Sequence, residues 1–278
     1  MESGLYVVAT PIGNFGDISH RAVEVLLGVN LIAAEDTRHS QRLLQHFSIN
    51  TPAIAYHDHS DGRAQAKIFA CLEEGGAVAL VSDAGTPLIS DPGYRLVRAA
   101  QEQGYVVRPV PGACAAIAAL SVSGLATDRF LFEGFLPAKA GTRVNRLNEL
   151  ASEKSTLIFY EAPHRIEDSL LAMIEVFGEA REAVLAREIT KTFETLRRGS
   201  LTDLAAFVSG DANQRRGEIV LLVEGKKGQE SELDDATRNL LVRLARELPA
   251  KRAAAVVSDL SGLRKKLLYQ YLLDIKQS

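Results

Sequence analysis

The first half of this chain alternates short apolar runs with segments of helical periodicity. The apolar runs predicted as strands are 5–9, 31–34, 53–56, 77–81 and 105–110. Strands that alternate with helices are typical of a parallel sheet covered by helices on both faces. A second set follows, with strands predicted at 130–135, 155–161, 183–187, 191–197 and 219–224. We therefore predict the α/β class: two α/β domains with mostly parallel sheets that form a cleft.

The composition changes after the last predicted strand. Residues 226–235 are polar and lack periodicity, which is typical of a linker, and residues 236–278 have a helical pattern. We predict an N-terminal α/β domain at 1–118, a C-terminal α/β domain at 119–228 and a basic helical extension at 229–278, with a hinge near 122–128.

The predicted helical extension differs in charge from the rest of the chain. Its segment 236–278 contains nine Lys and Arg against three Asp and Glu, whereas the whole chain has a net charge of −3. Such asymmetry indicates an appendage that binds a polyanion. The alternative, a small helical cap whose basic residues form a solvated face, stays open at this point.

Composition excludes several other classes of protein. Hydrophobic residues make up 46% of the chain and charged residues 24%, as in globular proteins. Cys71 and Cys114 are far apart and predict neither a disulfide framework nor a zinc site. Apolar runs such as 113–120 are too short to cross a membrane, and residues 1–10 do not resemble a signal peptide. We expect a reduced, cytoplasmic protein with no membrane partner.

The stretch that follows the strand at 77–81 has the composition of a ligand-binding loop. It contains Asp83, whose carboxylate can accept hydrogen bonds from a pair of ligand hydroxyls, and Gly85, which lets a ligand approach the backbone. Ser90 or Asp91 is predicted to cap the next helix, as Ser19 does earlier in the chain. An ordinary strand-to-helix turn with a capping Asp is the alternative interpretation.

Polar clusters follow six of the predicted strands. They are 10–17, 35–39, 82–91, 111–114, 160–165 and 187–191. Because carboxyl ends of parallel strands share one edge of a sheet, these clusters predict one large cleft. A nicotinamide-binding site is disfavoured, since the first turn offers only Gly13 and Gly16, with Pro11 where that motif needs glycine.

Several of these stretches together resemble a known family. ATPIGNFGD (9–17), AAEDTRHS (33–40), LVSDAGTPLISDPGY (80–94), PVPGACAA (109–116) and FYEAPHRI (159–166) are similar to motifs of the class III, tetrapyrrole-methylase-like methyltransferases. The resemblance covers residues 5 to 225 in order. The tetrapyrrole branch typically has a GxGxGD first loop, whereas this chain has TPIGN, so the closest resemblance is to the branch that methylates the ribose 2′-hydroxyl of a cytidine in small-subunit ribosomal RNA.

This resemblance implies S-adenosylmethionine as the methyl donor, bound between the two α/β domains. Carried over by position, the donor-binding residues are Pro11, Asp83, Gly85, Thr86, Gly112, Ala113, Cys114, Ala115 and Tyr160. Cys114 is interpreted as a wall of the pocket, because no base stands beside it in the sequence. The resemblance further implies ribosomal RNA or the small ribosomal subunit as partner, and a homodimer.

A ribose hydroxyl is a weak nucleophile that benefits from a base or from nearby cations. The candidate bases are Asp36, Glu161 and His164, each of which could equally be a cap or an ion-pair partner. The candidate phosphate contacts are Arg38, Arg165, Arg187 and Lys191. We expect no metal, and interpret His57, His59 and Asp61 as a chance resemblance to a metal cluster.

Two other functions remain open from the sequence. One is methylation of a tetrapyrrole or other small molecule on the same fold. The other is a non-catalytic module that binds S-adenosylmethionine and RNA. The basic extension and the TPIGN loop favour RNA methylation over both.

Overall fold

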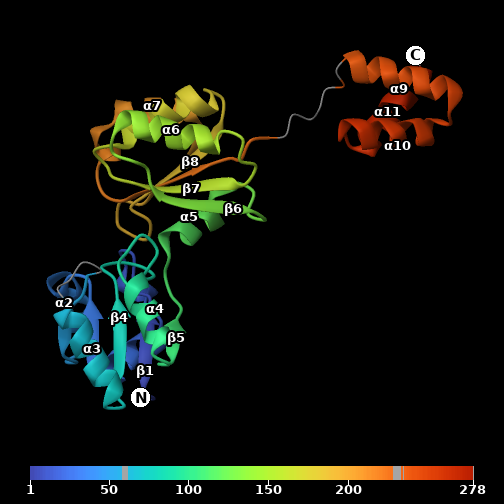
Figure 1. The fold of residues 1–278 in the computed structure, drawn as a ribbon. Coiled ribbons are helices and arrows are strands. Elements are labelled where there is room, and N and C mark those ends of the chain that lie inside the picture. The colour runs from blue at the N-terminus through green and yellow to red at the C-terminus, as the bar shows by residue number, and fades with distance from the viewer. Residues whose placement is uncertain (58–61, 228–232, 234, 278) are drawn as a thin grey trace. The chain divides into compact units, whose positions relative to one another are not determined.

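The computed structural model describes residues 1–57, 62–227, 233 and 235–277. The chain divides into two compact units, Met1–Lys226 and Lys227–Ser278. The first unit contains two sheets, and the second contains only helices (Figure 1). Most of the predicted linker at 226–235 and the predicted boundary after residue 228 lie outside the described residues.

The first sheet is parallel throughout, as predicted. Its strands are β1 (Gly4–Val8), β2 (Leu31–Ala34), β3 (Ala53–Ala55), β4 (Ala77–Val81) and β5 (Val107–Val110). They lie in the order β3-β2-β4-β1-β5, and all four neighbouring pairs run in the same direction. Every residue of β4 is buried, because helices cover both faces of the sheet and leave no side of this central strand to solvent.

Helices pack on both faces of this sheet. They are α1 (His20–Gly28), α2 (Thr37–His46), α3 (Arg63–Glu73) and α4 (Tyr94–Glu102), with a short 3₁₀ helix η1 (Phe15–Asp17). Side chains of β1 alternate between the two cores: Tyr6 and Val8 pack with α1, whereas Leu5 packs with α3 and α4. This alternation follows from the two-residue period of a strand.

One of the two helix caps predicted from the sequence is correct and the other is wrong. Ser19 caps α1 by accepting the Ala22 N–H, as predicted. The predicted cap of α4 at Ser90 or Asp91 is wrong: the capping position is Gly93, which has no side chain to bond the helix. The chain is still a loop at Ser90, whose φ of 68° is left-handed. Neither Ser90 nor Asp91 therefore caps α4.

The second sheet corrects the expectation of mostly parallel pairing. Its strands are β6 (Phe130–Phe135), β7 (Thr156–Glu161), β8 (Glu182–Arg187), β9 (Thr195–Ser200) and β10 (Ile219–Val223), in the order β6-β7-β10-β8-β9. Only β6 and β7 are parallel; the other three pairs are antiparallel. The loop from β8 to β9 is too short for a parallel crossover, and β10 enters between β7 and β8 from the opposite end.

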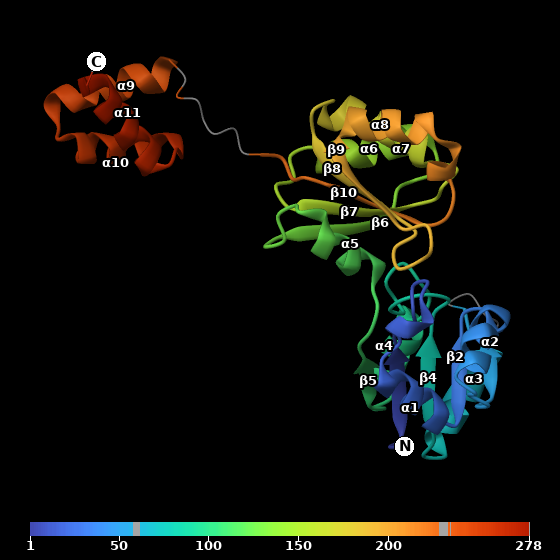
Figure 2. The same ribbon diagram turned by 180° about the vertical axis from the view of Figure 1, so that it is seen from behind.

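Four helices and a 3₁₀ turn cover the second sheet. They are α5 (Ala115–Ser123), α6 (Ala140–Leu150), α7 (Ile166–Phe177), α8 (Leu201–Gly210) and η2 (Ala212–Arg215). Figure 2 shows α6, α7 and α8 on one face and α5 on the other. Buried Ala119 and Leu120 of α5 pack against this sheet. The predicted boundary between 118 and 119 falls inside α5, so we propose a boundary just before Ala115.

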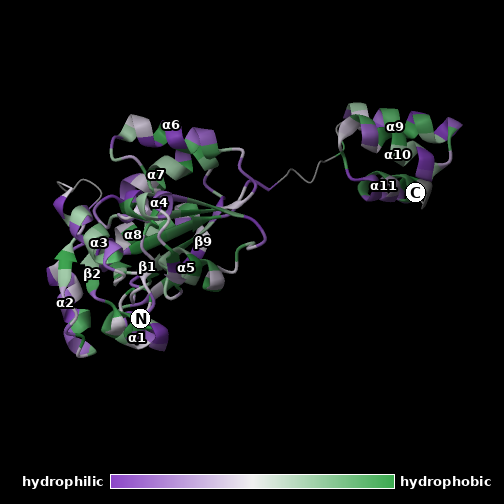
Figure 3. Cartoon of the chain, turned by 60° about the horizontal axis from the view of Figure 1, so that its bottom comes forward, coloured by the Kyte–Doolittle hydropathy of each residue, from purple (hydrophilic) through white to green (hydrophobic). Residues whose placement is uncertain are grey.

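The second unit is a bundle of three helices, which agrees with the predicted helical extension. They are α9 (Asp235–Glu247), α10 (Ala250–Ser261) and α11 (Lys265–Gln277). Its separate core includes Leu241, Val257 and Leu268. Green and purple segments alternate along α9 in Figure 3, as expected of an amphipathic helix. No helix in the described part of the chain is long and apolar enough to cross a membrane.

Candidate functional site

The loops after β1 and β4 meet at one edge of the first sheet. The Thr10 N–H donates to the Gly85 carbonyl at 2.8 Å, and the Gly85 N–H donates back to the Thr10 carbonyl at 3.1 Å. Since β1 and β4 are neighbours whose chain connections leave in different directions, this edge is a topological switch point. Open α/β sheets bind ligands at such points.

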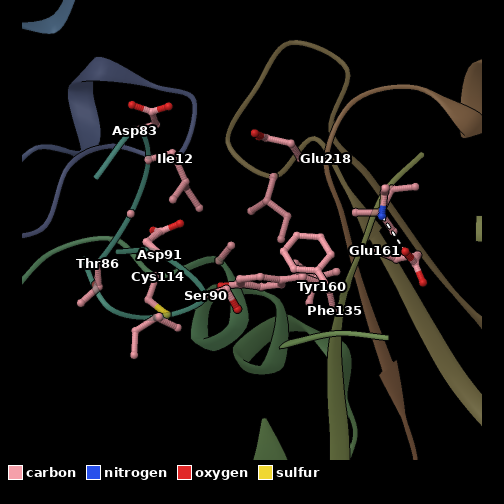
Figure 4. Close-up of a pocket in the computed structure, with 18 of the residues that line it drawn as sticks. Ile12, Asp83, Thr86, Ser90, Asp91, Cys114, Phe135, Tyr160, Glu161 and Glu218 are labelled. Carbon is pink, nitrogen blue, oxygen red and sulfur yellow. Dashed lines mark hydrogen bonds between the residues drawn. The ribbon is translucent and has the colours of Figure 1, made fainter. Parts of the chain in front are cut away.

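A cavity of about 440 Å³ opens beside these loops, a volume within the usual range of small-molecule sites. Its walls come from the loop after β4, the start of α5, the ends of β6 and β7, and the residues that enter β10. Figure 4 shows Asp83, Thr86 and Asp91 on one side of it and Phe135 and Tyr160 on another.

One wall of the cavity is acidic. The Asp36 N–H donates to Asp83 Oδ1 at 3.0 Å, and the Asp83 N–H donates to Glu35 Oε2 at 3.3 Å, so the ends of β2 and β4 hold each other. Burial raises the pKa of Asp91 to about 6, and the charges of Glu35 and Asp83 add to the effect. Burial also raises the pKa of Glu35. This wall suits a cationic ligand or one with several hydroxyl groups.

The opposite wall is aromatic and apolar. The Tyr160 hydroxyl accepts the Ala116 N–H at 3.2 Å at the start of α5, and burial raises the pKa of that hydroxyl. The rings of Phe135 and Tyr160 lie 5.8 Å apart, edge to face. Thr86 donates from its hydroxyl to the Ala113 carbonyl at 2.9 Å, which ties the loop after β4 to the start of α5.

Six of the nine residues predicted to bind the donor line this cavity. They are Asp83, Gly85, Thr86, Cys114, Ala115 and Tyr160. Pro11 lines a neighbouring cavity instead. Ala113 takes part through its bond to Thr86, and Gly112 packs closely on Ala9.

The three candidate bases lie in different surroundings. Asp36 accepts two bonds from the Arg38 guanidinium and caps α2, and these hydrogen bonds lower the pKa of its carboxyl to about 2. Glu161 lines the cavity but is 3% exposed, and its oxygens accept from the Ala162 N–H and the Ser169 hydroxyl. His164 is exposed and lines neither this cavity nor its neighbour.

The four candidate phosphate contacts are also dispersed. Arg187 is 6% exposed and donates to Gln214, Thr195 and the Phe193 carbonyl, so its guanidinium is enclosed by protein. Arg165 donates to the Leu136 carbonyl and pairs with Glu161. Arg38 is exposed and paired with Asp36. Lys191 alone lines one of the two cavities, where Glu188 and Glu218 hold its ammonium.

The sequence interpretation did not assign several other lining residues to the site. They include Ile12, Glu35, Ser90, Asp91, Phe135 and Glu218. Glu35 and Asp91 belong to two of the polar clusters, 35–39 and 82–91, so the sequence contained evidence that could have placed them in the site. Glu218 was not predictable from parallel pairing: Ile219 pairs with Glu161, so the residues entering β10 meet the carboxyl end of β7 only because β10 is antiparallel.

The described residues contain no group of three or more His, Cys, Asp or Glu arranged to hold a metal ion. His59 and Asp61 of the chance cluster lie outside the described residues, whereas His57 lies within them.

Comparison with protein families assigns both units. The family of Tetrapyrrole (Corrin/Porphyrin) Methylases matches residues 4–205, and the RsmI C-terminal HTH domain matches residues 231–276. The chain is 57% identical over 273 residues to the "Ribosomal RNA small subunit methyltransferase I" of Pseudomonas aeruginosa, covering 97% of this chain and 96% of that protein. It is 53% identical over 270 residues to the protein of that name from Escherichia coli O157:H7, covering 97% and 94%.

Solved structures share the fold at low sequence identity. The uroporphyrin-III-C-methyltransferase of Thermus thermophilus superposes with a TM-score of 0.58 at 19% identity, over 79% of this chain and 93% of that one. A cobalt precorrin-4 methyltransferase superposes with a TM-score of 0.62 at 17% identity, over 79% and 94%. The resemblance seen in the sequence motifs is confirmed: the chain belongs to the tetrapyrrole (corrin/porphyrin) methylase family and, within it, to the group of ribosomal RNA small subunit methyltransferase I proteins.

Proposed function

We propose that this protein transfers a methyl group from S-adenosylmethionine to the ribose 2′-hydroxyl of a cytidine in small-subunit ribosomal RNA. The observation that carries this proposal is the length of the match to relatives named for ribosomal RNA methylation. It spans the α/β unit and the helical unit alike, covering 97% of the chain. A small-molecule methylase of this fold has no evident use for the basic helical unit.

The larger cavity fits the proposed donor. S-adenosylmethionine carries a sulfonium, an ammonium, a ribose diol and a flat adenine. The carboxylates of Asp83 and Asp91 suit its positive charges and hydroxyls, and Tyr160 with the small residue Ala115 offers an apolar surface to the adenine. Gly85 has a φ of 80°, and a side chain there would meet Ile12 at 3.2 Å, so this loop depends on glycine to pass close to the cavity.

The reaction requires positioning more than acid–base chemistry. When bound, S-adenosylmethionine supplies a methyl group whose C–S bond breaks as the ribose oxygen forms a C–O bond, while the sulfur keeps the electron pair and the hydroxyl loses its proton. Asp36 is a weak base because its pKa is about 2, and both oxygens of Glu161 are already hydrogen-bonded. We propose that the proton passes to water and that in-line alignment supplies most of the acceleration.

We further propose that the protein acts as a cytoplasmic homodimer. The proposed substrate, ribosomal RNA, is found in the bacterial cytoplasm. Exposed apolar side chains gather on α5 and on the edge strand β6, where Ile117, Val122 and Phe130 are 50%, 56% and 44% exposed. Unpaired sheet edges with apolar side chains favour association. Light scattering after size-exclusion chromatography tests this, and a monomer at micromolar concentration would contradict it.

The test of the reaction is a map of ribose methylation in small-subunit RNA, made by mass spectrometry from cells with and without the gene. We expect one methylated cytidine to disappear with the gene and to return with it. RNA unchanged by the deletion would overturn the proposal. Methylation of a tetrapyrrole by the purified protein would then support the small-molecule alternative, and binding of donor and RNA without transfer would support the binding-module alternative.

A further inference from the structure

A second cavity, of about 280 Å³, lies beside the first. It is lined by the loop after β1, by one face of α2, and by Lys191. The linings of the two cavities share Ile12, Asp83, Ala84 and Glu218. A molecule in the second cavity therefore lies against a wall of the first, where the methyl donor is proposed to bind.

One unpaired positive charge, the guanidinium of Arg42, lines this second cavity. Arg42 is exposed and forms no ion pair or hydrogen bond through its side chain with any described residue. No Asp or Glu occurs on α2 to neutralise it. Lys191 also lines the cavity, with its stem packed against Gly13, but its ammonium is already paired with Glu188 at 2.8 Å and with Glu218 at 2.6 Å. Arg38 on the same helix is paired with Asp36, whereas Arg42 is available for an external anion.

A buried hydroxyl in the same lining also lacks a partner. Ser40 is 5% exposed, and its Oγ forms no hydrogen bond with any described group. A serine inside a helix ordinarily satisfies its hydroxyl with a nearby carbonyl or with solvent. Unsatisfied buried polar groups are uncommon because they are costly, so each one calls for an explanation, and a bound ligand or ion is one of them. Ser40 is thus a second sign, independent of charge, that a polar ligand enters here.

An aromatic side chain completes the lining. Phe15 is 38% exposed, and its ring centroid lies 4.8 Å from that of His46. A partly exposed ring supported from behind offers a stacking surface to an unpaired base.

We propose that the second cavity is the acceptor-nucleotide pocket, in which Arg42 and His39 bind a backbone phosphate of single-stranded RNA and Phe15 stacks on its base. The inference rests on the proposed function. The fork of an arginine matches phosphate oxygens, and Ser40 can donate to the same group. The shared wall carries the carboxylates of Asp83 and Glu218, which repel phosphate, so the ribose hydroxyl is the part of the nucleotide that faces the donor.

The test uses full-length protein and small ribosomal subunits from cells that lack the gene, with labelled S-adenosylmethionine. Arg42→Gln should raise the KM for subunits roughly tenfold to a hundredfold, with kcat and donor affinity unchanged. The slope of log affinity against log salt should become shallower by about 0.7, the loss of one phosphate contact on a single strand. The matched control is Arg98→Gln, which removes an arginine paired with Glu102 on α4, away from both cavities. It should change neither quantity.

Ser40→Ala separates a binding role from a structural one. Removal of an unpaired buried hydroxyl should leave the melting temperature unchanged or higher, whereas loss of a ligand contact should raise the KM about threefold to tenfold. An unchanged KM and salt slope in Arg42→Gln would overturn the pocket, as would a parallel loss of donor affinity. Wild-type protein that transfers no methyl group to the subunits would instead overturn the proposed function, and the pocket with it.

Discussion

At the residue scale, the carboxylates on the acidic wall of the larger cavity repel one another in the free protein. Glu35, Asp83 and Asp91 face one space, and burial with mutual repulsion raises the pKa of Asp91 to about 6. The cationic donor that we propose for this cavity would relieve this repulsion, and the relief would favour binding. The polar clusters in the sequence predicted that these loops belong to the site. Only the fold shows that the three carboxylates line the same cavity.

Asp91 should therefore make stability depend on pH. An acid whose pKa is raised on folding stabilises the fold below its ordinary value of 3.8, and that contribution is lost as pH rises through about 6. Asp91→Asn cannot ionise, so it should melt above wild type at pH 7.5, by a margin that shrinks at pH 5. Thermal melting at both pH values measures this. Asp128→Asn, an exposed site outside both cavities, is the control, and a margin equal at both pH values would contradict the prediction.

Asp83 should contribute directly to donor affinity. Asp83→Ala removes a half-buried carboxylate, and we expect donor binding to weaken by about 1–3 kcal/mol, measured by calorimetry. The same change loses the bond from the Asp36 N–H, so Asp83→Asn, which keeps an acceptor there, is the better test of charge. Unchanged affinity in both folded variants would remove Asp83 from the site.

Arg187 should prove structural, in contrast to the phosphate role predicted from sequence. Its guanidinium donates to Gln214, Thr195 and the Phe193 carbonyl, and joins β8 to the start of β9 and to η2. Arg187→Met should lower stability by about 3 kcal/mol, because these buried acceptors lose a charged donor. Chemical denaturation measures the loss. A stable variant with a raised KM for subunits would restore the phosphate role.

At the element scale, the two sheets differ in how far the sequence predicts them. In the first sheet each strand is followed by a helical segment, and this alternation correctly indicated parallel strands. In the second sheet β10 is fully buried, and its run IVLLV carries no sign of direction. The signal that was available is the helix-free connection between β8 and β9, which requires antiparallel strands. Because the sequence interpretation did not use this signal, it did not predict Glu218 as a site residue.

The loop after β4 depends on glycine at one point, and this can be tested against a matched position. Gly85 and Gly75 have φ values of 80° and 78°, but a Cβ at Gly85 would meet Ile12 at 3.2 Å, whereas Gly75 faces open space. Either change to Val should cost about 1–2 kcal/mol of stability from the left-handed backbone. Only Gly85→Val should also abolish donor binding in calorimetry. Native methylation by Gly85→Val would show that residues 82–91 do not form the donor cradle.

At the scale of the whole molecule, the two units differ in the sign of their net charge. The α/β unit is acidic overall, although the unpaired guanidinium of Arg42 lines its second cavity. The segment 236–278 has nine basic residues against three acidic ones. Lys265 and Lys266 begin α11, where cations oppose the helix dipole, and both are exposed with no ion pair among the described residues. Such placement adds nothing to the stability of the unit and suits an external polyanion.

Removal of the helical unit should separate donor binding from RNA docking. A chain that ends at residue 226 keeps both sheets, all four of their core clusters and every residue that lines the two cavities. We expect it to fold and to bind S-adenosylmethionine with native affinity in calorimetry. Its affinity for small subunits should fall, and the slope of log affinity against log salt should become shallower, because fewer phosphates are neutralised. Full-length protein with Arg264, Lys265 and Lys266 changed to Gln is the matched control and should reproduce part of that loss. A truncated chain with native affinity and slope would show that the helical unit is a structural cap.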